Sequence, residues 1–415
     1  KMKRGRCPSW PLMKEWHYFD SPGFPLSLQR QTNFKIRYDM AGIYLHIPFC
    51  KTRCIYCDFY STTREDLKRR YVQALCKELR MRRDYLQGAP VETVYFGGGT
   101  PSQLGEEDFA GIFRTLQEVY GLENAVEITL EANPDDLTEA YVDTLRRFPF
   151  NRISMGIQTF DDATLRLLHR RHTARQAIEA VQRCREAGFQ NLSIDLIYGL
   201  PGETEERWQR DLEEAIRLHP EHISAYHLTY EEGTPLHRLL LSHQVREVDE
   251  DVSLRLFNRL TQSLKRAGYV HYEISNFCLS GHHARHNTSY WQGIPYLGCG
   301  PSAHSFDTQS REWNLASLEA YITSLENGQR PYEQETLSPD TRYNEYVMTG
   351  LRTLWGISTD KILQDFGAGR LHYLQKMAAP HLKSGKLMEN DGHIRLTQQG
   401  IFVSDDILSD LMFVE

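Results

Sequence analysis

Three cysteines stand close together in the stretch His46-Ile-Pro-Phe-Cys50-Lys-Thr-Arg-Cys54-Ile-Tyr-Cys57-Asp-Phe59, with the spacing C-x3-C-x2-C. Thiolates of cysteine are the usual protein ligands of cubane iron–sulfur clusters, and three in one short loop can hold three corners of such a cluster. A ferredoxin-type cluster needs a fourth cysteine, and none follows at a suitable spacing. One iron is therefore expected to stay open to a ligand that is not protein.

These cysteines have two alternative uses, a structural zinc site and a disulfide framework. A structural zinc site could combine them with His46, but zinc ligands usually come as two C-x2-C pairs and the chain has no second pair. A disulfide framework is less favoured, because no export signal is recognisable and the remaining cysteines are scattered singly. They are Cys7, Cys76, Cys184, Cys278 and Cys299. The spacing favours an iron–sulfur cluster.

The composition is that of a globular protein. Hydrophobic residues make up 40% and charged residues 25% of the 415 residues, and the formal net charge is −7. No apolar run approaches the ~20 residues that span a bilayer, so we expect a cytoplasmic protein, in a compartment reducing enough for the cluster. The mild acidity gives no reason to expect nucleic acid as a partner. The length favours two or more domains.

Residues 1–39 differ from the rest. They mix basic residues, prolines and aromatics without a helical or strand period, and they lack the apolar core of a signal peptide. Met40 then opens directly onto the strand-like run Ala41-Gly-Ile-Tyr-Leu-His46. We predict an extension over residues 1–39, disordered, and a folded unit that begins at Met40.

Short β-rich runs then alternate with amphipathic stretches, the pattern of a parallel sheet built from βα units. The expected strands are Ile43–Ile47, Thr93–Phe96, Glu127–Leu130, Arg152–Ile157, Leu192–Ile197 and Ile223–Leu228. The expected helices are Asp66–Tyr85, Glu106–Tyr120, Thr138–Arg147, Ala174–Ala187 and Glu205–His219. The fold class predicted is α/β.

Polar or glycine residues stand at or near the end of each expected strand. Active sites of parallel barrels form at the carboxyl ends of the strands, so these residues should share one rim. They are Gly98, Gly99, Thr100, Glu131, Gln158, Asp195 and Thr229. Singly, each has an ordinary reading: a turn, a helix cap, a buried acid. Together they suit a zwitterionic nucleoside, which needs partners for its amine, carboxylate and hydroxyl groups.

These motifs resemble the radical S-adenosylmethionine (SAM) superfamily, in the branch that contains the oxygen-independent coproporphyrinogen III dehydrogenase HemN and the heme chaperone HemW. The matching segments are His-Ile-Pro-Phe-Cys, Gly-Gly-Gly-Thr-Pro, Gly-Ile-Gln and Ile-Asp-Leu-Ile-Tyr-Gly-Leu-Pro, in this order. The resemblance implies an open six-stranded parallel (β/α)6 barrel and a 4Fe–4S cluster on Cys50, Cys54 and Cys57, with SAM on the open iron. It implies a SAM pocket of Tyr44, Phe59, Gly98, Gly99, Thr100, Glu131, Gln158, Arg170 and Asp195, with Thr229 as a further candidate. Arg170 could bind the SAM carboxylate through two of its guanidinium nitrogens. The basic run that contains Arg170 could equally be a solvated face.

Two features separate the members of this branch. The motif of the dehydrogenase continues to a further cysteine two positions after the third, and Phe59 stands in that place. The segment His286-Asn-Thr-Ser-Tyr290-Trp291 resembles the H-N-x-x-Y-W motif associated with HemW proteins. Imidazole is a good axial ligand for heme iron, and the two rings offer flat apolar surface. The alternative for all three side chains is core packing, with His286 hydrogen-bonded among them.

The remaining chain divides into two further parts. Residues 233–335 are expected to be helical, with an edge strand over Tyr269–Phe277 before the His286 motif, and residues 40–232 to form the barrel. Over residues 336–415, expected helices at Thr341–Leu354, Ser358–Phe366 and Leu371–Ser384 precede a hairpin that turns at Asp391-Gly392. This order is typical of a winged helix. Many such modules bind DNA, but this one has no dense basic patch, so it is predicted to close over the barrel mouth.

The function expected is that of a heme chaperone that holds a 4Fe–4S cluster, SAM and heme and passes heme to an apo-acceptor such as a respiratory enzyme. The alternative is an oxygen-independent coproporphyrinogen III oxidase, whose radical would abstract hydrogen from a propionate side chain. A DNA-binding module is a distant third. The sequence leaves open whether the protein is an enzyme, whether it cleaves SAM and whether it forms a homodimer.

Overall fold

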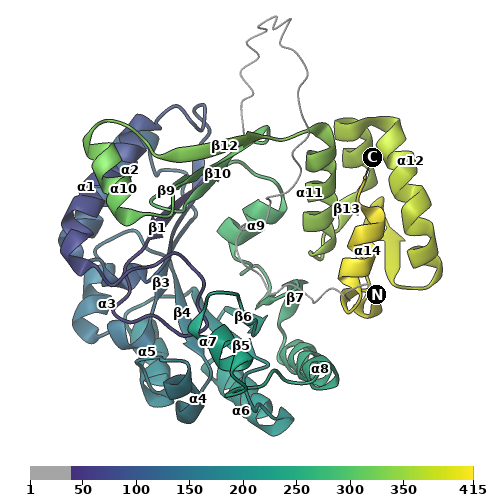
Figure 1. The fold of residues 1–415 in the computed structure, drawn as a ribbon, viewed down its shortest axis with the longest axis horizontal. Helices are drawn as coiled ribbons and strands as arrows, with labels where there is room; N and C mark the ends of the chain where they lie inside the picture. Colours follow the sequence, from purple (N-terminus) through teal and green to yellow (C-terminus); the bar gives the residue numbers. More distant parts are fainter. Residues whose placement is uncertain (1–38, 415) are drawn as a thin grey trace, which may run out of the picture.

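Six parallel strands form the centre of the computed structural model, which describes residues 39–414 (Figure 1). The strands stand in chain order across the sheet and pair in parallel with their neighbours. They are β1 (Ala41–Ile47), β2 (Val91–Gly98), β3 (Glu127–Ala132), β4 (Arg152–Gln158), β5 (Leu192–Tyr198) and β6 (His222–His227). The predicted open six-stranded parallel barrel is confirmed, and each predicted strand end lies within two residues of the observed one.

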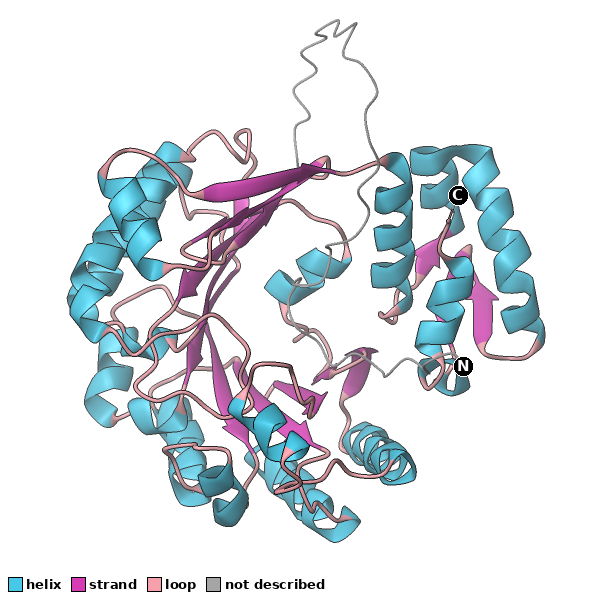
Figure 2. Cartoon of the chain, viewed as in Figure 1, coloured by secondary structure: helices cyan, strands magenta, loops and turns pink. Residues whose placement is uncertain are grey.

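Alternation along these strands separates two environments. One face carries buried aliphatic residues such as Ile43, Val94 and Ile153, which pack with the helices into one core. The layer on that face consists of α1 (Lys68–Met81), α2 (Glu106–Tyr120), α3 (Glu139–Leu145), α4 (Asp162–Leu167), α5 (Ala174–Glu186) and α6 (Glu205–Leu218), as Figure 2 shows. The other face is polar on every strand, so the inside of the barrel is lined by side chains that need partners.

The sheet extends beyond the barrel at both edges, which the sequence did not predict in full. Beside β1 lies β9 (Tyr296–Cys299), followed by β10 (His304–Phe306), β11 (Ser310–Asn314) and β12 (Tyr332–Thr336). Beside β6 lies a hairpin of β8 (Asn276–Cys278) and β7 (Val270–Glu273). The prediction of one edge strand over Tyr269–Phe277 is therefore wrong in form, because the chain reverses between Glu273 and Asn276.

Helices α7 (Pro235–Leu241), α8 (Glu250–Arg266), α9 (Arg285–Trp291) and α10 (Leu318–Glu326) complete the part of the chain between the barrel and its C-terminal domain. Helix α9 carries the His286 motif, for which no helix was predicted. In Figure 1 it lies on the concave side of the sheet, between the sheet and the C-terminal domain. Short 3-10 turns occupy Glu65–Leu67, Pro101–Gln103 and Pro134–Asp136.

The C-terminal domain has its own hydrophobic core. Its elements are α11 (Pro339–Leu351), β13 (Ile357–Ser358), α12 (Thr359–Lys383), β14 (Leu387–Asn390), β15 (His393–Leu396), α13 (Gln398–Ile401) and α14 (Ser404–Leu411). Gly367, with φ of 81°, breaks α12 into the two helices that were predicted. The hairpin turns at Asp391 and Gly392, both with positive φ, as a two-residue turn of this kind requires. The winged-helix-like fold is confirmed.

This domain packs against the edge strands at the side of the barrel. The amide of Leu354 donates to the carbonyl of Tyr272 on β7 at 2.9 Å, and Arg311 on β11 pairs with Glu345 on α11. We propose the domain division 40–232, 233–335 and 336–415; the boundary after residue 335 separates the two cores, whereas residues 40–232 and 233–335 share the first of them. The predicted extension 1–39 lies outside the described residues, Asp39 apart. In the described part of the chain, no helix is long and apolar enough to cross a bilayer.

Candidate functional site

The three cysteines lie on a loop that leaves the carboxyl end of β1, which we call the cysteine loop (residues 48–62). Its base is closed by two backbone hydrogen bonds, Cys50 N to Thr62 O at 2.9 Å and Thr62 N to Pro48 O at 2.7 Å. Its tip is tied to two distant segments through Ile55, whose amide donates to Leu168 O and whose carbonyl accepts from Leu236 N. Backbone hydrogen bonds thus hold the base and the tip of the loop, and the three sulfur atoms take no part in them.

Two donors point at the sulfur atoms of this loop. The Thr100 hydroxyl lies 3.2 Å from Cys50 Sγ, and Arg170 Nη1 lies 3.4 Å from Cys54 Sγ. Burial raises the pKa of the Cys57 thiol to about 12, and the neighbouring Cys54 and Cys50 add to the rise. Such thiols become thiolates when a cation binds the sulfur. Within the described residues no three His, Cys, Asp or Glu side chains converge around one metal ion; a cubane cluster gives each thiolate a different iron.

The glycine triplet Gly97–Gly99 lies at the end of β2, where the start of the cysteine loop passes across it. A Cβ on Gly99 would lie 2.8 Å from the carbonyl carbon of Pro48, and one on Gly98 would lie 2.7 Å from the His46 ring. Gly98 also has φ of 108°, which favours glycine. The amide of Gly99 donates to Ile47 O at 2.8 Å. The triplet therefore joins the second strand end to the cysteine loop.

Two carboxylates face the inside of the barrel. Glu131 accepts from the Tyr95 hydroxyl at 2.6 Å and from the Gly98 amide at 3.2 Å. Burial raises the pKa of Glu131 to about 7, although the hydrogen bond from Tyr95 lowers it. Burial likewise raises the pKa of Asp195 to about 6. Burial thus disfavours the ionised form of both acids, and a positive charge nearby favours it.

The other predicted SAM residues lie at the same end of the sheet or beside it. Arg170, on the loop after α4, donates to Asn133 Oδ1 at 2.6 Å and to the carbonyl of Gly156, and its Nε has no partner. Gln158 ends β4 with φ of 72°, an uncommon conformation that often marks functional sites. Tyr44 is half-buried in β1, Phe59 is 37% exposed on the cysteine loop, and Thr229 is half-buried just after β6.

The predicted heme residues are placed differently. Both ring nitrogens of His286 are engaged, Nδ1 with the Thr93 hydroxyl at 2.7 Å and Nε2 with the Tyr290 hydroxyl at 2.8 Å. Burial, with Arg152 nearby, lowers the pKa of His286 to about 3, so the ring is neutral. Trp291 is buried as well. Neither nitrogen of His286 is free to bind iron in this arrangement, so the structure favours the packing alternative for His286.

Several side chains of the barrel interior were missed from the sequence. Tyr95 holds Glu131, Asn133 holds Arg170, and Ser154 donates to Asp195 at 3.4 Å. Arg152, at the first position of β4, is buried among them. The signal was present: polar residues recur at every second position of the strands, and a period of two assigns them to one face.

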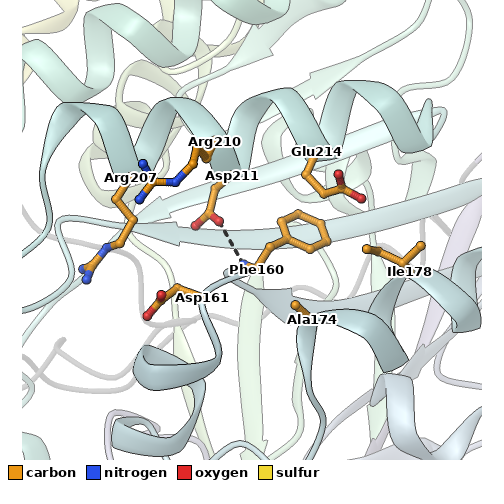
Figure 3. A pocket seen from close by; sticks show the side chains of 8 residues that line it. All are labelled: Phe160, Asp161, Ala174, Ile178, Arg207, Arg210, Asp211 and Glu214. Carbon is orange, nitrogen blue, oxygen red and sulfur yellow. Dashed lines mark hydrogen bonds between the residues drawn. The ribbon is translucent and has the colours of Figure 1, made fainter.

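A surface pocket elsewhere contains none of the predicted residues. It measures about 280 Å³ and lies on the outer, helix-covered side of the sheet (Figure 3). Its lining is Phe160, Asp161, Ala174, Ile178, Arg207, Arg210, Asp211 and Glu214. Asp211 accepts from the Phe160 amide at 2.9 Å, which ties α6 to the end of β4.

Comparison with protein families finds two matches along the chain. Residues 44–215 match the radical SAM superfamily, and residues 337–403 match the HemN C-terminal domain. Heme chaperone HemW of Mycobacterium tuberculosis is 33% identical over 89% of this chain and 94% of its own length. HemW of Lactococcus lactis is 32% identical, over 89% and 96%. A radical S-adenosyl methionine domain-containing protein 1, mitochondrial, of Danio rerio is 30% identical, over 90% and 87%.

Among solved structures, the coproporphyrinogen III oxidase HemN of Escherichia coli has the same fold. Its TM-score is 0.79 at 24% identity, and the match covers 91% of this chain and 90% of that one. The likeness therefore extends over the barrel and the C-terminal domain together.

Proposed function

The chain belongs to the HemN/HemW branch of the radical SAM superfamily, and on that premise we propose that it is a heme chaperone on a radical SAM barrel. It would hold a 4Fe–4S cluster, SAM and heme, and deliver heme to an apo-hemoprotein, for example a respiratory enzyme of the membrane. The observation that carries the proposal is the likeness to HemW proteins over nearly the whole chain, together with Phe59 in place of a further cysteine.

The cysteine loop fits a cubane cluster. Cys50, Cys54 and Cys57 would each bind one iron, and the donors Thr100 and Arg170 already lie against two of the sulfurs. Hydrogen bonds to sulfur tune the potential of such clusters. A reduced cluster held by these three cysteines would supply an electron to SAM. The role of the chain is to hold the loop at its base and tip and to keep the thiols out of water.

The rim of the barrel fits SAM, a ligand with two positive groups and one negative group. Glu131 and Asp195 offer acceptors for positive groups, and Arg170 offers donors for the carboxylate. The glycine triplet allows close approach of the backbone. We propose the pocket residues Tyr44, Phe59, Gly98, Gly99, Thr100, Glu131, Gln158, Arg170 and Asp195, with Thr229 as a further member.

Heme is proposed to bind at the side of α9 that faces the C-terminal domain. His283, three residues before the engaged His286, lies half-buried between the rings of Tyr272 and Trp355, with centroids at 6.1 Å and 5.9 Å. Its ring nitrogens make no hydrogen bond within the described residues. Aromatic flanks and a neutral imidazole suit a porphyrin and its iron. We therefore propose His283 as the iron ligand, with the motif His286, Tyr290 and Trp291 as its support.

The deciding experiment is anaerobic reconstitution, followed by parallel assays on one preparation. Heme binding without conversion of coproporphyrinogen III, in the presence of SAM and a reductant, is the expected result. Robust decarboxylation by a protein that binds no heme would establish the oxidase alternative instead. The compartment proposed is the cytoplasm, and no nucleic-acid partner is proposed.

A further inference from the structure

The side chain of Arg152 lies inside the barrel, and Arg152 is not one of the proposed pocket residues. It is the first residue of β4, and its side chain is 1% exposed. Ser154, two positions on, donates to Asp195 and so faces the interior; Arg152 shares that face because side chains alternate along a strand. Figure 1 shows β3, β4 and β5 adjacent at the centre of the sheet.

The guanidinium of Arg152 lacks partners at short range. Its Nε and Nη1 are buried without a hydrogen bond, and among the described residues no acid pairs with it within ion-pair distance. Its register neighbour on β3, Thr129, also has a buried hydroxyl without a partner. A buried charge left uncompensated is strongly destabilising, so the charge of Arg152 must be balanced across a longer distance or by a polar occupant.

The carboxylates that can balance it are those of the SAM rim. Glu131 stands two residues beyond Thr129 on β3, and Asp195 on β5 pairs in register with Gly156 on β4. Arg152 lowers the pKa of both acids, opposing the burial that raises them. The same charge lowers the pKa of His222 and His286, which are neutral for this reason as well as through burial.

The remaining titratable groups around these two acids do not compete with Arg152. Burial raises the pKa of each tyrosine hydroxyl nearby, so all stay neutral at physiological pH. They are Tyr44 on β1, Tyr95 on β2, Tyr226 on β6 and Tyr290 on α9. Arg170 adds a second positive charge on the side of Asp195 that faces the cysteine loop.

We propose that Arg152 is a positioning residue of the SAM site, the buried counter-charge that keeps Glu131 and Asp195 ionised below the bound ligand. The inference rests on the proposed SAM pocket. Arg152 and Arg170 carry two positive charges and the ionised Glu131 and Asp195 carry two negative charges, so this set of side chains is neutral overall. Because Arg152 has no ion pair of its own, its field acts on both acids rather than on one.

The test is SAM affinity of the reconstituted protein across pH, for wild type, Arg152→Met and Arg152→Lys. Arg152→Met should weaken SAM binding about tenfold near neutral pH, one pKa unit on a required carboxylate. The loss should shrink towards about pH 8.5, where the acids ionise without help. Arg152→Lys keeps the charge and should keep most of the affinity. A loss of equal size at every pH, not rescued by lysine, would show a merely structural role and overturn the inference.

A second measurement does not need SAM. Infrared titration of the protein without ligand reports the carbonyl stretch of protonated carboxyl groups, assigned with Glu131→Gln and Asp195→Asn. Arg152→Met should move that titration to higher pH, and an unmoved titration contradicts the inference. Failure of wild type to bind SAM would count against the proposed function and leave this measurement intact. If Arg152→Met does not fold, Arg152→Lys decides: titration close to wild type supports the inference, and an upward shift as large as loss of the charge predicts overturns it.

Discussion

Individual thiols differ in what surrounds them. Cys50, Cys54 and Cys57 share one loop with donors aimed at two of the sulfurs, whereas Cys184 is buried in α5 among aliphatic side chains. Cysteine surrounded by apolar atoms behaves as a small hydrophobe. Position in the fold, rather than residue type, thus separates the proposed ligands from the inert cysteines.

We expect Cys54→Ser to lose most of the iron after reconstitution, because a cluster with two thiolates is poorly held. Wild type should hold about four irons per chain, with a spectrum that SAM alters. The measurement is iron and sulfide content beside the visible spectrum. Cys184→Ser is the matched control and should keep its iron; full retention in Cys54→Ser would refute the cluster assignment.

Carboxylates also differ by surroundings. Glu131→Ala and Asp195→Ala should each weaken SAM binding by about 1–3 kcal/mol, the usual effect of leaving a polar partner unpaired. Calorimetric titration of the reconstituted variants measures this. Asp211→Asn changes a buried acid of similar raised pKa on the outer side of the sheet and should leave SAM affinity unchanged. Equal SAM affinity in wild type and both alanine variants would place SAM elsewhere.

For heme, His283→Ala should abolish the Soret spectrum of a histidine-ligated complex while cluster iron stays intact, because only that imidazole is removed. His286→Ala should instead lower thermal stability, since it deletes bonds to Thr93 and Tyr290 in the buried interior. His282→Ala is the neighbouring control. An unchanged heme spectrum in His283→Ala, with loss in His286→Ala, would return the ligand role to the motif itself.

At the scale of elements, the loop after β2 and the cysteine loop act as one unit. Gly99 packs against the backbone of Pro48, and α7 reaches the tip of the cysteine loop through the bond from Leu236 N to Ile55 O. A flexible side chain can move away from a newly introduced side chain, but the backbone of Pro48 cannot. A substitution at Gly99 should therefore displace the cysteine loop and its thiols.

Gly99→Ala should therefore reduce iron content and destabilise the fold by about 1–3 kcal/mol, the usual range for overpacking. Iron analysis and chemical denaturation measure the two effects. Gly111→Ala, in the middle of α2 with nothing within 4 Å of its new Cβ, should leave iron unchanged and slightly raise stability. If Gly99→Ala retains all iron, the two loops are not coupled as described.

At the scale of the whole molecule, the barrel and the C-terminal domain meet along β7. Glu273 lies there, buried, and burial raises its pKa to about 8 although Ser275, Asn276 and Arg352 lower it. The native state therefore holds a proton that the unfolded chain, with its ordinary glutamate pKa, releases at lower pH. From this group, stability falls as pH rises from about 5 to about 8.

Glu273→Gln should remove that part of the pH dependence, which we put at roughly 3 kcal/mol across this range. Unfolding in denaturant at several pH values measures it, with wild type as the reference. Other buried acids keep a smaller slope of the same sign. A variant that loses stability with pH as steeply as wild type would show that Glu273 titrates normally.

The barrel, its six strands and the cysteine loop could be predicted from the sequence, because alternation, turn residues and cysteine spacing are local properties of the chain. The winged-helix-like order of helices and hairpin could be predicted as well, since the Asp391-Gly392 turn and the helical stretches are each recognisable from a few residues. The strand-end residues Glu131, Gln158 and Asp195 followed from one rule about parallel strands.

The contacts inside the barrel could not be predicted from local sequence patterns. Three features depend on contacts between segments far apart in the chain. His286 is hydrogen-bonded at both ring nitrogens, Arg152 has no ion-pair partner among the described residues near the two acids, and β9 pairs with β1. The residue type alone does not show whether the ring of a histidine is free or buried. Burial and partner choice set its pKa and its availability, and these come from packing across the sheet rather than from local pattern.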